Sequence, residues 1–173
     1  MSRKMMSPNT RLDFIPEDAV DALGEAYDPE APKAEFFTDA TNLSCAVVAG
    51  YTLNPAKSTT DSTKSICDEA TVENPASVNY EGMFTFFREG DPLDTTSAYS
   101  RAFAEFRTGG KRGYWVRRTG KKNMVPVTAG DTVSSFLFES DEPKDVLADD
   151  APIQFSAKML QQASMSLFKT VIA

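Results

Sequence analysis

The sequence of 173 residues contains no histidine, and this absence excludes several kinds of chemistry. Without an imidazole there is no Ser-His or Cys-His nucleophile, no histidine ligand for zinc and no imidazole acid–base group. The two cysteines, Cys45 and Cys67, are too few for a structural zinc site. Nothing indicates an oxidising compartment, so we expect reduced, half-buried thiols rather than a disulfide.

Long hydrophobic runs are also missing. No window approaches the roughly 18 apolar residues that a membrane helix needs. The first residues carry two cations but no apolar stretch, so they do not resemble a signal peptide. Hydrophobic residues make up 41% and charged residues 25% of the chain, which is typical of one globular domain.

The sequence also lacks recognisable catalytic and ligand-binding motifs. The acidic run at 141–150 is typical of an exposed loop and has neither the spacing of a calcium loop nor the burial that a catalytic pair needs. The glycine-rich segments match neither phosphate-binding pattern. We therefore expect no catalytic residue, no cofactor and no metal, and an enzyme is the least favoured class.

What the sequence does contain is a set of strand patterns. The clearest is an alternation over 76–89 that places five residues on one face: Val78, Tyr80, Gly82, Phe84 and Phe86. Further strands are expected at 11–16, 43–53, 113–118, 124–128, 132–140, 152–160 and 163–173. The segments 113–118 and 124–128 are expected to pair as a hairpin that turns at Gly120.

One convincing helix is expected at about 95–108. Its apolar stripe follows helical spacing, and Asp94, Thr95 or Thr96 can serve as its N-cap. Gly109–Gly110 should end it in the left-handed conformation. A single turn of helix is possible at 18–23. The stripe consists of Tyr99, Ala102, Phe103 and Phe106.

These elements predict a mainly β fold, a β-sandwich or barrel with one flanking helix. Residues 1–28 are expected to form an N-terminal arm, and 29–173 a single domain. A long inter-strand loop is expected at 54–65, because a dozen polar residues there show no periodicity.

Charge is distributed unevenly along the chain. The 25 acidic residues outnumber the 18 basic ones, so a net charge of −7 should repel nucleic acid at long range. Residues 13–39 nevertheless carry nine acids against one lysine, beginning with Asp13, Glu17, Asp18, Asp21 and Glu25. Residues 107–122 carry seven cations and no acid: Arg107, Lys111, Arg112, Arg117, Arg118, Lys121 and Lys122.

Three interpretations of the basic segment remain open. The favoured one is that its cations dock on the acidic segment of another copy, because such head-to-tail contacts produce rings. A second is a solvated strand edge, where cations discourage aggregation. A third is single-stranded nucleic-acid binding, with Tyr114 and Trp115 stacking on bases between the cations.

The order of several segments resembles a known family. They are 28–45 (DPEAPKAEFFTDATNLSC), 79–89 (NYEGMFTFFRE), 94–118 (DTTSAYSRAFAEFRTGGKRGYWVRR) and 128–143 (TAGDTVSSFLFESDEP). Together they are similar to the major tail protein, or tail tube protein, of long-tailed bacteriophages, particularly those infecting actinobacteria. The resemblance covers about 29–173, and its specificity lies in the order of the segments.

The resemblance implies a structural virion protein that catalyses no reaction. In that family a β-sandwich with one flanking helix assembles into stacked six-fold rings, and sheets of the subunits join around a channel for viral DNA. The implied partners are further copies, the tape-measure protein, and terminator and baseplate proteins, with assembly in the host cytoplasm. A head-decoration or tail-completion protein is the alternative within virions.

The resemblance also gives the charged segments and the loop a role. Rings would stack through the long loop, for which we single out Asn54, Lys57, Thr60, Asp61 and Lys64. The basic and acidic residues named above would lie at subunit contacts and away from the channel. A negatively charged subunit suits a channel for DNA, because cationic contacts would bind phosphate tightly.

Overall fold

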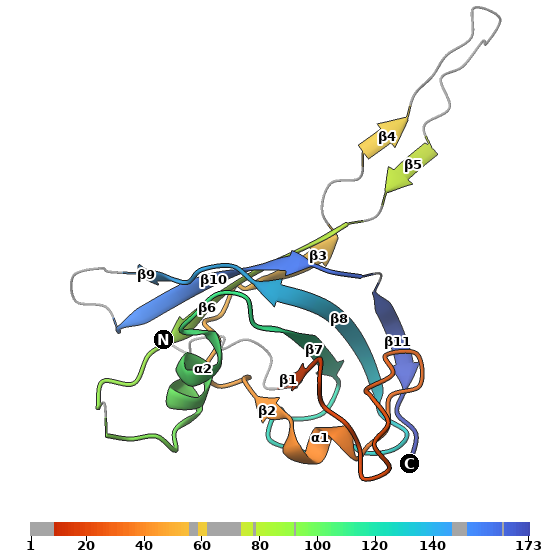
Figure 1. Cartoon of the computed structure of the whole chain (residues 1–173), viewed down its shortest axis with the longest axis horizontal. Coiled ribbons are helices and arrows are strands. Elements are labelled where there is room, and N and C mark those ends of the chain that lie inside the picture. Colours follow the sequence, from red (N-terminus) through yellow and green to blue (C-terminus); the bar gives the residue numbers. More distant parts are fainter. Residues whose placement is uncertain are drawn as a thin grey trace, which may run out of the picture.

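The computed structural model describes residues 9–55, 59–61, 74–77, 79–91, 93–146, 152–163 and 165–173. They form a nine-stranded antiparallel sheet, a separate two-stranded ribbon and two helices (Figure 1). The elements are β1 (Thr10–Pro16), α1 (Phe36–Asp39), β2 (Thr41–Asn42), β3 (Thr52–Pro55), β4 (Thr59–Asp61), β5 (Asn74–Ser77), β6 (Tyr80–Phe87), α2 (Ala98–Phe106), β7 (Arg112–Thr119), β8 (Thr132–Ser140), β9 (Lys144–Val146), β10 (Gln154–Gln161) and β11 (Ser166–Thr170).

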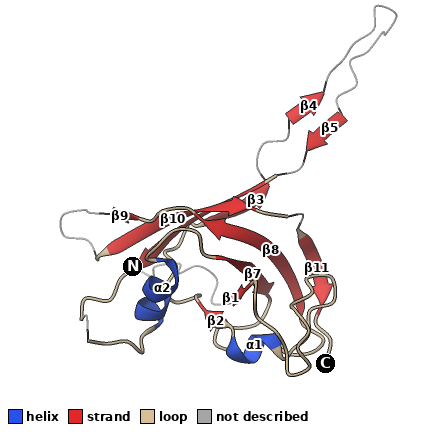
Figure 2. Ribbon diagram, in the orientation of Figure 1, coloured by secondary structure: helices blue, strands red, loops and turns tan. Residues whose placement is uncertain are grey.

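The sheet divides into two layers at β8. Its order is β2-β1-β7-β8-β10-β6-β3, with β11 paired to β8 and β9 paired to β10. One edge of β8 pairs with β11 through Thr132–Ser135 and with β10 through Phe138–Ser140. The layer of β10, β6 and β3 therefore lies over the layer of β1, β7 and β8, and α2 lies at one end between them (Figure 2). The predicted mainly β fold with a flanking helix is confirmed.

The space between the layers is filled by aromatic side chains. Trp115 of β7 is completely buried and stacks on Phe84 of β6 with ring centroids 4.1 Å apart. Phe106 of α2 stacks on the same indole at 5.3 Å and meets Phe14 of β1 edge-on at 5.0 Å. Large aromatic rings bury most apolar area per residue, so this cluster joins both layers and the helix into one core.

The acidic segment covers the opposite face of the β1–β7–β8 layer. Ile15, Val116 and Val133 point out of that face and pack against aromatic side chains of the segment, including Tyr27 and Phe37. The Tyr27 hydroxyl also hydrogen-bonds the Ser135 hydroxyl at 2.8 Å. Strand β1 itself lies between β2 and β7, so residues 10–16 are part of the sheet rather than of an arm beside it. Residues 1–8 lie outside the described part of the chain.

The N-cap of α2 lies one residue after the positions expected for it. The Ser97 hydroxyl accepts the N–H of Ser100 at 3.1 Å, and the Asp94 carboxylate accepts the N–H groups of Thr96 and Ser97. Asp94 therefore supports the turn before the helix, while Ser97 is the N-cap. Gly110 has a φ of 81°, so the left-handed ending predicted from the two glycines is confirmed.

Two strand predictions are wrong. The apolar segment 43–53 is mostly a turn, in which Leu43 accepts the N–H groups of Ala46 and Val47, and only from Thr52 onward is it a strand. A buried turn and a buried strand need the same apolar side chains, so composition did not separate them. Residues 124–128 are not a strand either, because β7 pairs with β8 and 120–131 connects the two.

Two smaller differences from the predictions lie at residues 18–23 and in the acidic run 141–150. Residues 18–23 form turns rather than a turn of helix. The acidic run 141–150, expected to be a loop, contains strand β9 (Lys144–Val146). Residues 147–151 lie outside the described ranges. The strand predictions at 11–16, 132–140, 152–160 and 163–173 are confirmed as β1, β8, β10 and β11.

Gly113 lies where no side chain fits. A Cβ atom there would be 2.6 Å from both the Ile15 carbonyl oxygen and Phe14 Cζ. We expect Gly113→Ala to lower the free energy of unfolding by about 1–3 kcal/mol in urea denaturation, because β1 would have to move away from β7. Gly90→Ala is the matched control, since a Cβ there meets nothing within 4 Å. Equal losses in the two variants would contradict this packing.

Candidate assembly surfaces

Arg118, predicted to contact another subunit, is buried inside this one. Its side chain is 1% exposed and donates to the carbonyl oxygens of Lys122 (2.7 Å), Val125 (3.0 Å) and Pro126 (3.0 Å). It also lies 3.3 Å from the Asp131 carboxylate. The prediction is wrong for this residue, because Arg118 organises the connection 120–131 between β7 and β8.

Asp131 provides the counter-charge for this buried arginine. Its carboxylate is paired with Arg118 and with Lys121, and it accepts the N–H of Thr128 at 3.1 Å. Burial alone would raise the pKa of Asp131, but these hydrogen bonds and the Lys121 charge outweigh burial and lower the pKa. Lys121 therefore has a partner within its own chain.

A second buried ion pair lies beside the first. Arg11 Nε donates to Asp13 Oδ2 at 2.7 Å, and both side chains are almost fully buried. Burial raises the pKa of Asp13, and the hydrogen bond and charge of Arg11 only partly oppose it. Arg11 also donates to the Val125 carbonyl oxygen at 3.2 Å. Asp13, expected at a subunit contact, is thus a structural residue.

Two further acidic candidates, Asp21 and Glu25, lie around Lys33. The Asp21 side chain is 1% exposed, and Lys33 Nζ lies 2.6 Å from Asp21 and 2.5 Å from Glu25. The hydrogen bond from Lys33, with those from backbone N–H groups, lowers the pKa of Asp21. Asp18 is exposed. The subunit-contact prediction stays open for Asp18 and Glu25 and is disfavoured for buried Asp21.

The other cations are partly exposed, and several have partners in the same chain. Arg112 pairs with Glu17 at 2.7 Å, and Lys111 pairs with Glu105 at 3.2 Å. Arg117 lies over the Phe136 ring, 5.5 Å from its centroid.

The acidic and basic segments are neighbours because β1 pairs with β7 along its whole length. The assumption that they form opposite ends of the subunit is therefore wrong. Among the seven cations expected at subunit contacts, two are exposed and have no salt bridge within the described ranges: Arg107 and Lys122.

The structure contradicts the main observation behind the nucleic-acid interpretation, which was a base-stacking role for Trp115. Trp115 is completely buried in the core and offers no surface on which a base could stack. Tyr114 is partly exposed and packs against Tyr27, with ring centroids 4.8 Å apart. The alternation of cations and aromatics in this strand reflects its two faces, since Trp115 points between the layers and Tyr114 points to the opposite side.

The long loop is in part a pair of strands. Asn54 lies in β3, whereas Thr60 and Asp61 lie in β4, which pairs with β5 as a two-stranded ribbon. In Figure 1 the ribbon projects beyond β3, away from the two layers. Lys57, Lys64 and Cys67 lie outside the described residues. Cys45 is exposed, not half-buried as expected.

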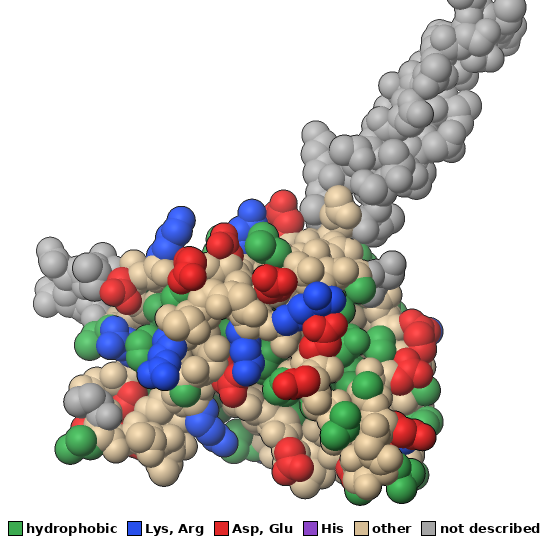
Figure 3. Space-filling model, in the orientation of Figure 1, with side chains coloured by type: hydrophobic (Ala, Val, Ile, Leu, Met, Phe, Trp, Pro, Cys, Tyr) green, Lys and Arg blue, Asp and Glu red, His purple; other side chains and the backbone are tan. Residues whose placement is uncertain are grey.

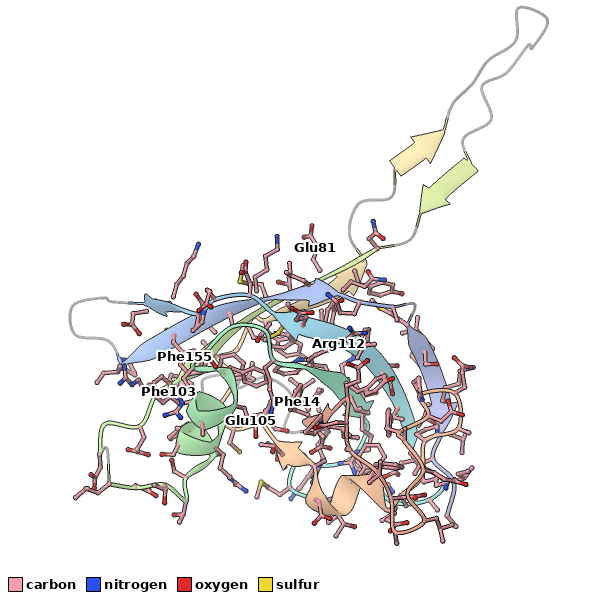
Figure 4. The ribbon with its side chains drawn as sticks, in the orientation of Figure 1. Phe14, Glu81, Phe103, Glu105, Arg112 and Phe155 are labelled. Carbon is pink, nitrogen blue, oxygen red and sulfur yellow. The ribbon has the colours of Figure 1, made fainter. Side chains whose placement is uncertain are left out.

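Within the described ranges, one broad sheet face carries no helix or loop above it. It is formed by β3, β6, β10 and β9, on the side away from the core (Figure 1). Figure 4 shows Glu81 of β6 pointing away from the molecule here, whereas Phe14 and Phe155 point between the layers. Its exposed side chains are Thr52, Glu81, Met83, Lys144, Lys158 and Leu160.

A groove of about 590 Å³ lies beside α2. Phe103, Ala104 and Ile153 give it apolar walls, and the Arg88 guanidinium lies over the Phe103 ring at 4.4 Å. Arg107 lines its rim. We call it the α2 groove.

Two further observations concern the described residues as a set. No helix among them combines the length and apolar character needed to cross a membrane. No three of their Asp, Glu and Cys side chains are grouped so that they could hold a metal ion.

Comparison with known proteins identifies the family. The family model described as phage tail tube protein matches residues 1–173. The chain belongs to the phage tail tube protein family. This tail tube protein is therefore a structural component of the phage tail, in a family that is in general non-enzymatic, and the resemblance found in the sequence is confirmed.

Solved structures agree with the fold of this tail tube protein. One is the cryo-EM structure of the anti-feeding prophage (AFP) baseplate, 6-fold symmetrised, to which the chain is similar with a TM-score of 0.50 and 10% identity. The match covers 98% of both chains, and at this identity it shows the fold alone. No curated protein matches the chain.

Two features of these surfaces were missed by the sequence analysis. The α2 groove combines residues of α2 with residues of the connection that follows β6 and with Ile153, which directly precedes β10, and no local pattern connects them. The roles of Arg11 and Arg118 depend on carbonyl groups 3 to 114 positions away. The one available signal was the alternation in β7, which places Trp115 and Arg117 on one face and Arg118 on the other.

Replacing Arg118 should be costly. In Arg118→Met the buried Asp131 carboxylate loses one of its two cations, and four carbonyl groups, including that of Lys121, lose their donor. We therefore expect a loss of about 3–5 kcal/mol in the free energy of unfolding. Urea denaturation measures it. Lys122→Met is the matched control from the same segment, and its exposed side chain should change stability by less than about 0.5 kcal/mol. Similar losses would show that Arg118 does not organise the connection.

Proposed function

We propose that this protein is the major tube subunit of the tail, and that its copies form stacked six-fold rings whose channel conducts DNA during ejection. The family match over the whole chain supports a tube protein. The six-fold symmetry of the structurally similar baseplate supports rings of six. The virion is then the place where the protein acts, after assembly in the host cytoplasm.

The observation that carries the proposal is the uncovered sheet face. In the described part of the chain, β3 pairs with β6 alone and β9 with β10 alone, so each has one edge without a strand. Exposed strand edges favour pairing with other chains. If β9 of one subunit lies beside β3 of the next, the sheet continues around the ring and the uncovered face lines the channel.

The charges on this face suit a channel for DNA. Glu81 is exposed on the same face as Lys144 and Lys158, so both signs are present and there is no continuous track of cations. Tight DNA binding requires many phosphates to be neutralised at once. With a net charge of −7 per subunit, DNA and the tape-measure protein would pass without being held.

The β4–β5 ribbon is the proposed contact between rings. It projects from the two layers at the end of β3, beside the uncovered face (Figure 1). In a ring this position would direct it along the channel axis toward a neighbouring ring. This proposal retains Asn54, Thr60 and Asp61 as residues of the stacking segment, together with Lys57 and Lys64 of the connection.

A single terminal ring is the second candidate. The similar structure is a baseplate component, and a tail-completion or baseplate protein could use the same fold without stacking. The two candidates differ in the assembled product, because a tube subunit forms long stacks and a terminal subunit stops at one ring.

Electron microscopy of the purified protein tests the proposal. At rising concentration we expect rings with a central hole and then tubes, because each added ring offers the same surfaces again. Mass photometry should show a species of six copies before tubes appear. A monomer at every concentration would contradict the tube proposal, and rings that never stack would favour the terminal ring.

Shortening the ribbon should separate ring formation from stacking. Because Pro55 and Tyr80 are opposite each other in the β3–β6 pair, a two-residue Asn-Gly turn can replace residues 56–79. We expect a folded subunit that forms rings but no tubes in electron micrographs. Tubes of normal length from this variant would show that the ribbon does not connect rings.

A further inference from the structure

Phe168 has a strained backbone that the fold itself does not require. Its φ is 57°, and it is the one non-glycine residue with a positive φ in the described ranges. It lies in a bulge of β11 between Ser166 and Lys169, where its N–H donates to the Ser134 hydroxyl at 3.2 Å. Aromatic residues rarely adopt this conformation, and such strain is often found at functional positions.

The result of the strain is an exposed aromatic ring. The Phe168 side chain is 74% exposed, although Leu167 beside it packs against the core. A ring that is mostly exposed gains little from burial within the subunit, whereas burial in a contact with another chain would be favourable. Phe168 therefore has the properties of an interface anchor.

The α2 groove can accept such a ring. Its volume of about 590 Å³ exceeds that of a phenylalanine side chain, and Phe103, Ala104 and Ile153 form its apolar walls. Arg88, already placed over the Phe103 ring, provides a cation beside a second aromatic. Ile153 is itself 51% exposed and would be covered by the incoming ring.

The charges around the two sites are complementary. Glu30, whose side chain is 62% exposed, accepts hydrogen bonds from Ser166 and Lys169 on either side of Phe168. These bonds lower the pKa of Glu30 and keep it ionised. Figure 3 shows red acidic side chains along the margin that holds β11, and most blue cations in the half that holds α2.

On the groove side, Arg107 is the cation without a close partner in the described part of the chain. Glu89, Asp91 and Asp94 also line the groove, but each accepts backbone N–H groups of its own turn. Arg107 has no salt bridge within the described ranges, and the nearest carboxylate to Arg88 is Asp145 at 3.9 Å. Arg107 at the groove rim can therefore pair with an incoming Glu30.

The two sites lie too far apart to meet within one subunit. Strand β11 and helix α2 are at opposite margins of the molecule in Figure 1. A contact between them joins two copies head-to-tail and leaves each copy with one free anchor and one free groove. Such heterologous contacts form a ring when the rotation from one copy to the next closes.

We propose that Phe168 of one copy inserts into the α2 groove of the next, with Glu30 beside Arg107, and that this contact joins neighbouring subunits in the ring. It rests on the proposed ring assembly, and it limits the charge contact between the acidic and basic segments to one pair, Glu30 and Arg107. Among the seven cations expected at subunit contacts, it assigns this role to Arg107.

Cross-linking tests the contact directly. In a background of Cys45→Ser and Cys67→Ser, we would mix a Phe168→Cys chain with an Ala104→Cys chain and add a short bismaleimide at a concentration where rings form. We expect covalent dimers on denaturing gels. Met124→Cys replaces Phe168→Cys in the control, because Met124 is comparably exposed at 69% and lies in the β7–β8 connection. Equal yields with Met124→Cys would overturn the proposal.

Phe168→Asn separates assembly from folding. Asparagine adopts positive φ more readily than phenylalanine, so thermal stability of the monomer should be unchanged or higher. Losing the buried ring should raise the concentration at half-assembly roughly tenfold or more. Normal assembly of Phe168→Asn, with rings from the unaltered protein, would overturn this contact and leave the tube function standing. Absence of rings in the unaltered protein would overturn both.

Discussion

The fold depends on the burial of one aromatic cluster between two layers of strands. Trp115 is at its centre, stacked on Phe84 of the opposite layer and on Phe106 of α2. The cluster is possible because β8 pairs with β11 at one end and with β10 at the other, which lets a single sheet turn over itself. Every other feature is placed relative to this core: the helix closes one end, the acidic segment covers the outer side of β1–β7–β8, and the face of β3, β6, β10 and β9 is left open.

Buried ion pairs then hold the connection between the two central strands. Arg118 and Arg11 donate to carbonyl groups of 120–131, while Asp131 and Asp13 provide the counter-charges. Buried charges are expensive unless they are paired and hydrogen-bonded, and here the partners come from β1, β7 and the connection itself. Much of the charge that is conspicuous in the sequence is therefore used to organise the subunit. The proposed contacts between copies rely instead on strand edges, a projecting ribbon and one aromatic anchor.

The two proposed modes of contact are compatible. Pairing of β9 with β3 would form the channel wall, whereas insertion of Phe168 beside α2 would join the margins of the subunits outside that wall. The first resembles strand addition, with many backbone hydrogen bonds and little side-chain selectivity. The second concentrates binding energy in one ring and one ion pair. A tube that must be rigid and self-specific benefits from both.

The sequence by itself determined the fold class, most strands, the helix and the family, because alternation, helical spacing and glycine positions are local properties that survive in the tertiary structure. It did not determine the partner of β7, the turn at 43–51 or the role of Arg118. Those depended on which distant groups came together around the core. The alternation in β7 is equally consistent with Trp115 inside or outside. A cation looks the same in sequence whether its side chain meets water or, as Arg118 does, five acceptors of the folded chain. Only the tertiary structure decided them, because burial is a property of the folded chain and not of any segment of it.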